Sequence, residues 1–331
     1  MSYTVAATNP RPGYDFAYER EALDPIAAEI VPVRAANEDE YAAAIAQADA
    51  VIAGPRVRLS ANVIGRLERC KIIANGGIGV DPVDVEAATE AGIVVTNVPD
   101  LFVDEVADQA FALLLAAQRK VVHCHGMTSG GRWSETWATL GHIPKLRGST
   151  LGLIAFGNIA KQVAVRAQAF GLRVVAYDPF VGPEAMRERN VEPRSLDDLL
   201  GESDIVSAHA PLTRDTFHLL GEPQFRQMKA TAIFINTGRG KVVDEPALIR
   251  ALQAGWIGAA ALDVLEQEPP DPANPLLHMP NVIVTPHMAS YSNEANIARR
   301  QRVGQEIAAV LQGGRPRHAV NPAVYAARER A

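Results

Sequence analysis

The sequence predicts an α/β protein made of two doubly wound parallel-sheet domains, and three observations support this prediction. The chain has 331 residues, which fits two domains of roughly 150 residues each. Apolar residues make up 48% of the chain, enough to build two cores. Short β-branched runs alternate with helical stretches, which is typical of βα units in a parallel sheet. Because this alternation occurs in two separate series, we expect two sheets.

The expected strands of the first series lie at residues 4–8, 48–53, 71–75 and 92–97. Those of the second series lie at residues 150–156, 172–178, 204–209, 231–236, 257–263 and 281–286. Helical spacers of βα length separate the strands within each series.

Three segments lie outside this alternation. An apolar helix is expected at residues 101–122, and residues 126–148 form an excursion rich in Gly, Ser and Trp with little helical periodicity. A last helix, residues 293–314, follows the second sheet and needs an apolar surface to pack on. We therefore expect it to return to the first domain.

Composition excludes several classes of function. The net charge of -6 and the pI near 5.8 argue against nucleic acid or an anionic membrane as a partner. Cys70 and Cys124 are the only cysteines, so neither a disulfide framework nor a cysteine metal site is expected. The sequence also shows no signal peptide and no membrane span. These features predict a cytoplasmic protein without a bound metal.

The stretch "TLGLIAFGNIA" at residues 150–160 resembles a dinucleotide-binding fingerprint in which Ala155 and Ala160 replace two of three glycines. The middle glycine, Gly157, is retained, and Asp178 follows about 20 residues later at the end of the next strand. This spacing predicts nucleotide binding, although an ordinary strand-to-helix turn has the same local pattern. Ala155 costs roughly 1–2 kcal/mol if its φ is positive and almost nothing if it is negative.

Asp178 also predicts the choice of cofactor. A carboxylate at this position accepts hydrogen bonds from the ribose hydroxyls and repels a 2′-phosphate. The next residues, Pro179 and Phe180, supply no cation. The pattern therefore favours NAD over NADP.

Eight motifs in order resemble the D-isomer-specific 2-hydroxyacid dehydrogenase family over residues 40–312. They are "NGGIGVDPVD", "DEVADQAFALLL", "GRWSETW" before "LRGSTLGLIAFGNIA", "YDP", "SAHAPLTRDT", "INTGRGKVVDEPAL", "ALDVLEQEP" and "VIVTPHMASYS". The resemblance implies an NAD-binding Rossmann domain, residues 100–289, inserted in a flavodoxin-like substrate domain of residues 1–99 and 290–331. It also implies hydride transfer between NADH and a 2-oxoacid, or the reverse from a D-2-hydroxyacid.

The resemblance implies a catalytic set of Arg239, Glu268 and His287. Arg239 follows an expected strand, and its guanidinium offers a fork for a carboxylate or carbonyl. His287 also follows a strand, and its imidazole can protonate the carbonyl oxygen during hydride transfer. A carboxylate at Glu268 would favour the charged imidazolium. Without the family context, a salt-bridge arginine, a structural histidine and a solvated glutamate are the alternative interpretations.

The remaining site residues are also implied by the resemblance. The backbone of Gly157, Asn158 and Ile159 would bind the pyrophosphate, and Asp178 the adenine ribose. His209 and Thr213 would flank the adenosine, and Asp263 would hold the nicotinamide carboxamide. Backbone amides of Gly76 and Gly77 would bind the substrate carboxylate, although a plain turn is the alternative there.

Some positions depart from related sequences. Phosphoglycerate dehydrogenases commonly carry arginine where this chain has Asn75. The branch most similar to this chain includes the C-terminal-binding-protein corepressors, which carry tryptophan where it has Ser290. Arg56 is a candidate anion contact or a solvated loop arginine.

Two alternative functions remain open: an NAD(H)-sensing, corepressor-like binding protein with incidental turnover, and a related dehydrogenase for a non-hydroxyacid substrate. The helix at 101–122 and the Trp-containing region at 120–148 resemble the family's dimerisation arm. Because exposed tryptophans such as Trp133 and Trp137 are seldom left uncovered, we expect a homodimer.

Overall fold

The computed structural model describes residues 2–54 and 57–328. The chain divides into two compact units, Met1–Leu101 with Ser292–Ala331 (unit 1) and Phe102–Tyr291 (unit 2). Each boundary lies two residues beyond the one expected from the sequence. Asp100 explains part of this difference, because its carboxylate pairs with Arg302 of the last long helix within unit 1.

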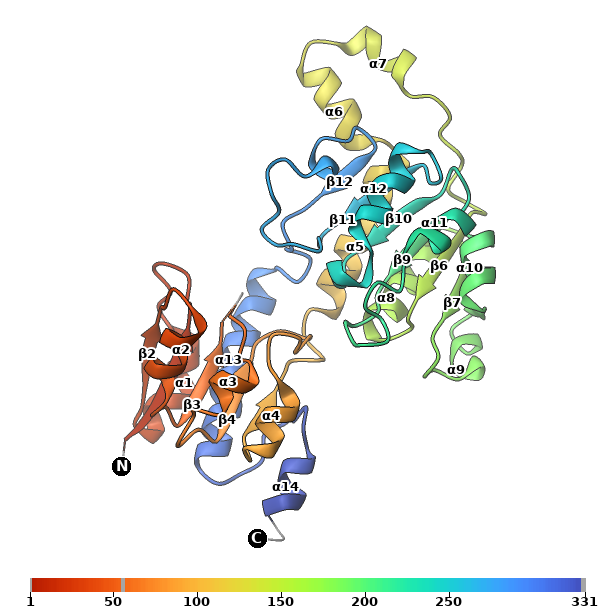
Figure 1. Ribbon diagram of the computed structural model, residues 1–331. Helices are drawn as coiled ribbons and strands as arrows, with labels where there is room; N and C mark the ends of the chain where they lie inside the picture. Colours follow the sequence, from red (N-terminus) through yellow and green to blue (C-terminus); the bar gives the residue numbers. More distant parts are fainter. Residues whose placement is uncertain (1, 55–56, 329–331) are drawn as a thin grey trace. The chain divides into compact units, whose positions relative to one another are not determined.

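Unit 1 contains a five-stranded parallel sheet (Figure 1). Its strands are β1 (Tyr3–Thr8), β2 (Ala28–Val33), β3 (Ala50–Ala53), β4 (Ile72–Asn75) and β5 (Val94–Thr96). The order β2-β1-β3-β4-β5, parallel throughout, is the flavodoxin-like order. Strand β2 is absent from the sequence prediction. It includes Pro32, which an edge strand tolerates because one side of its backbone needs no ladder partner.

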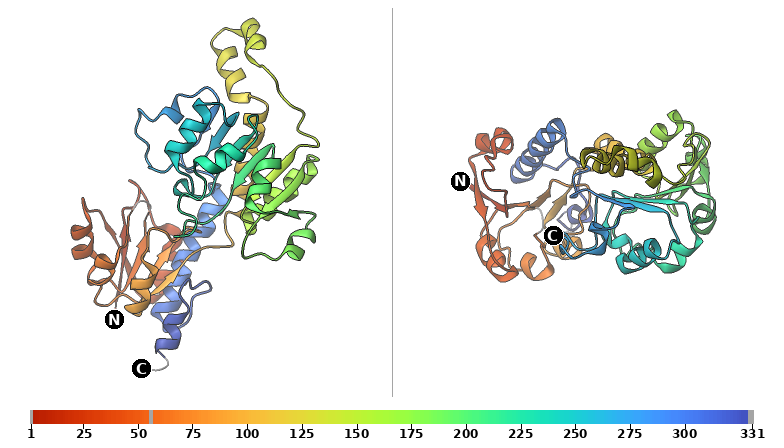
Figure 2. Two further views of the ribbon diagram at one scale, coloured as in Figure 1. Left: turned by 45° about the vertical axis from the view of Figure 1, so that its right-hand side comes forward. Right: turned by 90° about the horizontal axis from the view of Figure 1, so that it is seen from above.

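Helices lie on both sides of this sheet (Figure 2). They are α1 (Ala17–Leu23), α2 (Glu38–Ile45), α3 (Ala61–Ile64), α4 (Val85–Glu90), α13 (Asn293–Leu311) and α14 (Ala323–Arg328). Helix α13 packs apolar residues such as Val303 and Ile307 against one face of the sheet, together with Leu23 of α1. The returning C-terminal helix thus completes the core of unit 1.

Unit 2 contains a seven-stranded parallel sheet. Its strands are β6 (Thr150–Ile154), β7 (Arg173–Tyr177), β8 (Glu192–Pro193), β9 (Ile205–Ala208), β10 (Ile233–Asn236), β11 (Ala259–Leu262) and β12 (Val282–Val284). The order β12-β11-β10-β9-β6-β7-β8 is the Rossmann order with one further strand, β12, at its edge. The predicted fold class, two doubly wound parallel-sheet domains, is therefore confirmed.

The helices of unit 2 cover both faces of its sheet, except two that belong to the excursion. They are α5 (Val103–Gln118), α6 (Val121–Ser129), α7 (Trp133–Thr139), α8 (Asn158–Ala169), α9 (Pro183–Arg187), α10 (Leu196–Glu202), α11 (Glu222–Gln227) and α12 (Glu245–Gln253). One core contains residues of α5 and α8, and the other contains residues of α10, α11 and α12. The excursion at 126–148 includes the end of α6 and all of α7, whose short length hides their periodicity. Figure 1 shows these two helices projecting from the rest of unit 2.

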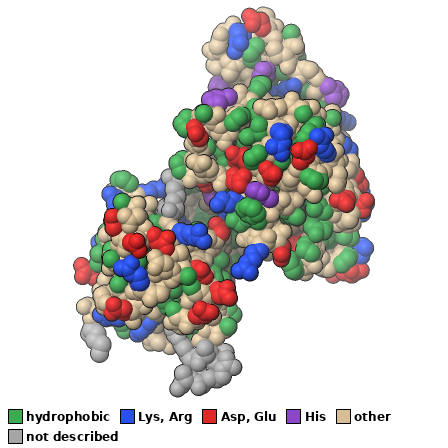
Figure 3. All heavy atoms as spheres, viewed as in Figure 1, with side chains coloured by type: hydrophobic (Ala, Val, Ile, Leu, Met, Phe, Trp, Pro, Cys, Tyr) green, Lys and Arg blue, Asp and Glu red, His purple; other side chains and the backbone are tan. Residues whose placement is uncertain are grey.

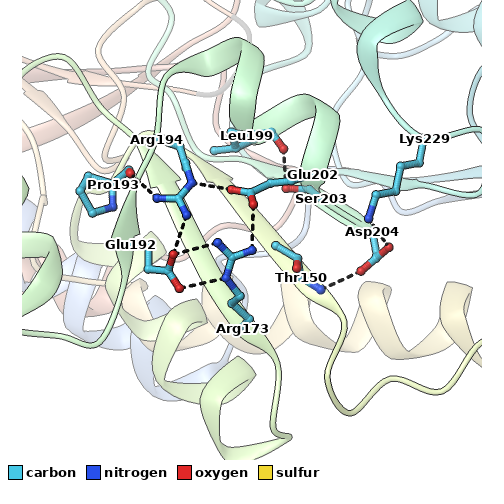
Figure 4. A network of polar contacts seen from close by, with 10 residues as sticks. All are labelled: Thr150, Arg173, Glu192, Pro193, Arg194, Leu199, Glu202, Ser203, Asp204 and Lys229. Atoms are coloured by element: carbon cyan, nitrogen blue, oxygen red, sulfur yellow. Dashed lines mark hydrogen bonds and ion pairs between the residues drawn. The ribbon is translucent and has the colours of Figure 1, made fainter.

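The edge of this sheet is held by an ion-pair network (Figure 4). Arg173 of β7 contacts Glu192 of β8 and Glu202 of α10, each at 2.8 Å. Arg194 contacts the same two carboxylates at 2.6 and 2.7 Å. Hydrogen bonding from Arg173 is the main cause that lowers the pKa of Glu192 to about 2. The network fixes β8, which has only two residues and was not predicted.

Charged side chains are spread over the visible surface, and the helices are short or polar. Figure 3 shows acidic and basic side chains interspersed over the visible face of each unit. Over the residues that the structure covers, none of the helices has the length and apolar character required to cross a membrane.

Candidate active site

The fingerprint loop connects β6 to α8, and Ala155 lies at its start. Its φ is 69°, in the left-handed region, and its N–H donates a hydrogen bond to the Tyr177 carbonyl at 2.8 Å. Of the two alternatives for this residue, the strained one is therefore found. A Cβ in this conformation costs roughly 1–2 kcal/mol, which a glycine would avoid.

Replacing Ala155 with glycine is expected to stabilise the protein by up to about 1 kcal/mol, because relief of strain exceeds the entropy that glycine loses. Thermal unfolding would show this as a rise of about 2–4 °C per kcal/mol. Ala160 is the matched control, since it lies inside α8, where Ala→Gly should destabilise by about 1 kcal/mol. Equal destabilisation by both substitutions would contradict strain at position 155.

The N-terminus of α8 has the geometry of an anion site. Gly157 is its N-cap residue, and no side chain caps the first turn, which contains Asn158 and Ile159. A Cβ built on Gly157 would meet no protein atom within 4 Å, so packing alone does not require glycine there. Unsatisfied backbone N–H groups and the helix dipole favour a phosphate at this position. These residues fit the pyrophosphate of a dinucleotide.

Asp178 lies at the end of β7, beside this loop. Its Oδ2 accepts a hydrogen bond from the Phe156 N–H at 2.8 Å, and its Oδ1 accepts from the N–H groups of Phe180 and Val181 at 2.8 and 3.2 Å. The carboxylate is thus fixed in orientation. Arg194 lines the same pocket as Asp178, but its guanidinium already contacts two carboxylates.

His209 and Thr213 follow β9, on the loop where the adenosine half is expected. The His209 Nε2 lies 2.9 Å from the Ser207 hydroxyl, and burial lowers the pKa of this imidazole to about 4. The ring is therefore neutral near pH 7. Thr213 is exposed and bonds to Thr216 through its N–H and its hydroxyl. The His209 and Thr213 side chains are thus uncharged, whereas Arg214 and Asp215 of the same loop are exposed and charged.

Asp263, at the end of β11, organises the segment that contains His287. Its Oδ1 accepts hydrogen bonds from the Thr285 hydroxyl at 2.5 Å and the Met288 N–H at 3.0 Å, and its Oδ2 accepts from the Ala289 N–H at 2.8 Å. The side chain is buried.

His287 and Glu268 form a direct pair. The His287 Nδ1 lies 2.6 Å from the Glu268 Oε2, while the Glu268 Oε1 accepts the Leu265 N–H at 3.1 Å. His287 has a φ of 53°, an uncommon conformation for a large residue, and the bonds to Asp263 maintain it. Burial raises the pKa of the Glu268 carboxyl, but His287, the Leu265 N–H and the charge of Arg239 together lower it below the ordinary value. Glu268 is therefore ionised at neutral pH.

Arg239 follows β10 and lies near the same carboxylate, as its effect on Glu268 shows. Its Nη1 donates to the Gly238 carbonyl at 2.8 Å. The next residue, Gly240, passes against the backbone of Leu265: a Cβ there would lie only 1.9 Å from the Leu265 carbonyl oxygen. Glycine at this position therefore allows the arginine loop to pass directly against the glutamate loop.

A second histidine–glutamate pair, which the sequence did not predict, supports these loops. The His218 Nε2 lies 2.8 Å from the Glu266 Oε1, and the His218 N–H donates to the Lys241 carbonyl. Glu266 also exchanges hydrogen bonds with Glu245 at the start of α12. The pair thus connects three loops. Its members are 48 positions apart in sequence, and no local motif links them.

In unit 1, Gly76 and Gly77 follow β4. The Gly77 N–H lies 3.3 Å from the Asn75 Oδ1, and the Asn75 Nδ2 donates to the Gly79 carbonyl at 2.7 Å. Asn75 therefore shapes this turn through its own amide. Arg56 lies outside the described residues.

Two further groups bear on function. Cys70 and Cys124 are free thiols, and burial raises the pKa of Cys70 to about 12, so its thiol is unreactive at neutral pH. Within the described part of the chain, no group of three or more His, Cys, Asp or Glu side chains is placed to hold a metal ion.

An uncapped helix start after the first strand of a Rossmann sheet, with an acid after the second strand, defines a dinucleotide-binding protein. The pair formed by His287 and Glu268, in loops that follow neighbouring strands, adds the acid–base group that a dehydrogenase requires. Comparison with known proteins gives the family. Residues 111–289 match the model described as "D-isomer specific 2-hydroxyacid dehydrogenase, NAD binding domain".

Relatives extend this similarity over most of the chain. Glyoxylate reductase of Korarchaeum cryptofilum is 43% identical and covers 82% of each chain. D-3-phosphoglycerate dehydrogenase of Archaeoglobus fulgidus is 39% identical over 86% of this chain and 54% of its own length. The crystal structure of Aquifex aeolicus D-lactate dehydrogenase, complexed with NAD and lactic acid, has a TM-score of 0.82 and 30% identity, covering 93% of this chain and 96% of that one.

The chain belongs to the D-isomer-specific 2-hydroxyacid dehydrogenase family. It is an NAD-dependent oxidoreductase that transfers hydride between a 2-hydroxyacid and a 2-oxoacid. The predicted family, reaction and cofactor are thus confirmed.

Proposed function

We propose that His287 is the general acid of 2-oxoacid reduction and that Arg239 binds the substrate. Glu268 would orient the His287 ring and stabilise its protonated form. The observation that carries this assignment is the 2.6 Å contact between the His287 Nδ1 and the Glu268 Oε2. Because Nδ1 faces the carboxylate, Nε2 is the nitrogen left to donate a proton to the substrate.

In the proposed reaction, bound NADH supplies the hydride that adds to the carbonyl carbon. His287 gives its proton to the carbonyl oxygen, so that the 2-oxoacid, NADH and one proton yield the 2-hydroxyacid and NAD⁺. The Arg239 guanidinium pairs with the negative charge of the substrate carboxylate and keeps the carbonyl group in position for the reaction. In the reverse direction, neutral His287 accepts the hydroxyl proton.

We assign unit 2 to the cofactor and unit 1 to the substrate. Gly157, Asn158 and Ile159 would hold the pyrophosphate through backbone N–H groups. Asp178 would bind the adenine ribose and favour NAD over NADP, since Arg194 beside it is already paired with acids. The uncharged side chains of His209 and Thr213 would flank the adenosine. The remaining assignments are Asp263 for the nicotinamide carboxamide and the Gly76 and Gly77 amides for the substrate carboxylate.

The direct experiment follows NADH oxidation with glyoxylate, hydroxypyruvate, pyruvate and phenylpyruvate, and repeats the series with NADPH. Reduction of at least one acid, faster with NADH, is the expected result. A protein that binds NADH but reduces none of them would favour an NAD(H)-sensing function instead. Higher kcat/KM with NADPH would overturn the proposed role of Asp178.

We also propose that the protein is a cytoplasmic homodimer whose interface includes α6 and α7. Trp133 and Trp137 are 68% and 73% exposed, and Val121 and Val122 are each 54% exposed. Such a cluster of large apolar side chains is typical of a covered interface. Light scattering at micromolar concentration should give the mass of a dimer, and Trp133→Ser with Trp137→Ser should shift it toward a monomer. A monomeric parent protein would refute this proposal.

A further inference from the structure

Arg194 lies beside the acid proposed to bind the adenine ribose. It directly follows β8, and its N–H donates to the Ala176 carbonyl of β7 at 2.9 Å, two residues before Asp178. Arg194 and Asp178 also line one cavity, together with Pro179 and Phe180. Among the described residues that line this cavity, Arg194 is the only cation. The 2′-phosphate of NADPH is attached to the ribose that Asp178 would bind, so it would enter the surroundings of Arg194.

Each nitrogen of the Arg194 guanidinium already has an acceptor. The Nε donates to the Glu202 Oε1 at 2.7 Å, the Nη2 to the Glu192 Oε2 at 2.6 Å, and the Nη1 to the Pro193 carbonyl at 2.9 Å. Figure 4 shows this head group held between the two carboxylates. The Arg194 side chain is nevertheless 29% exposed, so it is not sealed in the core.

The charges of this network balance each other. Arg173 donates to both oxygens of Glu192, at 2.9 and 2.8 Å, and to the Glu202 Oε2 at 2.8 Å. Two arginines therefore face two carboxylates. If Arg194 left the network to bind a phosphate, it would give up two charge-assisted hydrogen bonds, and the carboxylates would lose a counter-charge.

We propose that Glu192 and Glu202 determine cofactor specificity, because they hold Arg194 in the ion-pair network and so withhold from NADPH the cation that its 2′-phosphate requires. The inference rests on the proposed function, in which Asp178 binds the adenine ribose. Asp178 repels the additional phosphate, and the two glutamates occupy the arginine that would offset this repulsion. Discrimination against NADPH then has two sources, since specificity is a difference between two affinities.

The test measures the Kd of NADH and of NADPH by calorimetry, without substrate. The double variant combines Glu192→Gln with Glu202→Gln, which keeps the shapes and removes both charges. A triple variant adds Arg194→Gln to these two substitutions. The matched control combines Glu184→Gln with Glu188→Gln, which removes two negative charges from exposed positions at α9.

The parent should bind NADH more tightly than NADPH. The double variant should bind NADPH roughly tenfold to 100-fold more tightly than the parent does, because the released guanidinium forms charge-assisted bonds to the phosphate. Its Kd for NADH should change little. The triple variant should lose most of the gain, and the α9 control should resemble the parent.

Three results would overturn the inference: a double variant with the NADPH affinity of the parent, a gain that persists in the triple variant, or an equal gain in the α9 control. If the double variant loses NADH binding, Glu202→Gln alone decides, since it retains the two-pronged pair between Arg173 and Glu192. This single variant should bind NADPH more tightly than the parent, and an unchanged Kd would equally overturn the inference.

The parent protein separates this inference from the proposed function. If the parent binds NADPH more tightly than NADH, the proposed role of Asp178 fails, and the inference fails with it. If the parent prefers NADH but the variants show the same preference, only the role of Glu192 and Glu202 is wrong.

Discussion

Replacing His287 with alanine is expected to lower kcat for 2-oxoacid reduction by roughly 10²–10⁴-fold, the usual contribution of a positioned general acid. The substitution removes the group that donates the proton to the carbonyl oxygen. It leaves the α8 N-terminus and Asp178 intact, so NADH affinity should change little. Steady-state kinetics with a verified substrate and calorimetric NADH titration measure the two quantities.

His278 provides the matched control, because it is exposed and its Nε2 contacts the Pro272 carbonyl at 2.8 Å. His278→Ala should retain the kcat of the parent. If His287→Ala also turned over like the parent, His287 would not be the acid, and a binding role for the protein would gain support.

Replacing Arg239 with alanine is expected to lower kcat/KM by roughly tenfold to 100-fold, because a charge-assisted bond to the substrate is lost. KM should rise along with the fall in kcat, which distinguishes this variant from His287→Ala. Arg239→Lys keeps the charge but not the two-pronged geometry, so its activity should fall between those of the parent and the alanine variant.

Arg187→Ala on α9, which removes an exposed pair with Glu184, controls for loss of charge. Initial rates over a range of substrate concentrations separate KM from kcat. An unchanged KM in Arg239→Ala would contradict substrate binding by this residue.

Most strands could be predicted because buried parallel strands are continuous β-branched runs bounded by turn residues. Strand β2 escaped prediction because its pattern includes Pro32, and β8 escaped because two residues carry no pattern. Helices α6 and α7 were missed for a related reason: an exposed arm with few buried residues shows little amphipathic periodicity.

The family resemblance indicated Arg239, Asp263 and His287 as candidate site residues, and each of them lies shortly after a strand of the sheet. The backbone conformations of the site loops and the side-chain pairs between distant residues could not be predicted from the sequence. The sequence left the φ of Ala155 open, since an alanine fits either region at different cost. It also gave no sign that Asp263 fixes the segment from Thr285 to Ala289, or that His218 pairs with Glu266, because these contacts depend on how the loops fold back on each other.

The pH dependence of kcat in the parent and in Glu268→Gln tests the proposed proton relay most directly. Glu268 is ionised at neutral pH, since His287, Leu265 and Arg239 lower the pKa of its carboxyl despite burial. Its negative charge favours the imidazolium form of His287, and glutamine keeps the shape without the charge. The alkaline fall in the reduction rate should therefore move to lower pH in Glu268→Gln, because the variant loses the negative charge beside the imidazole. An alkaline limb at the same pH in both proteins would contradict the relay.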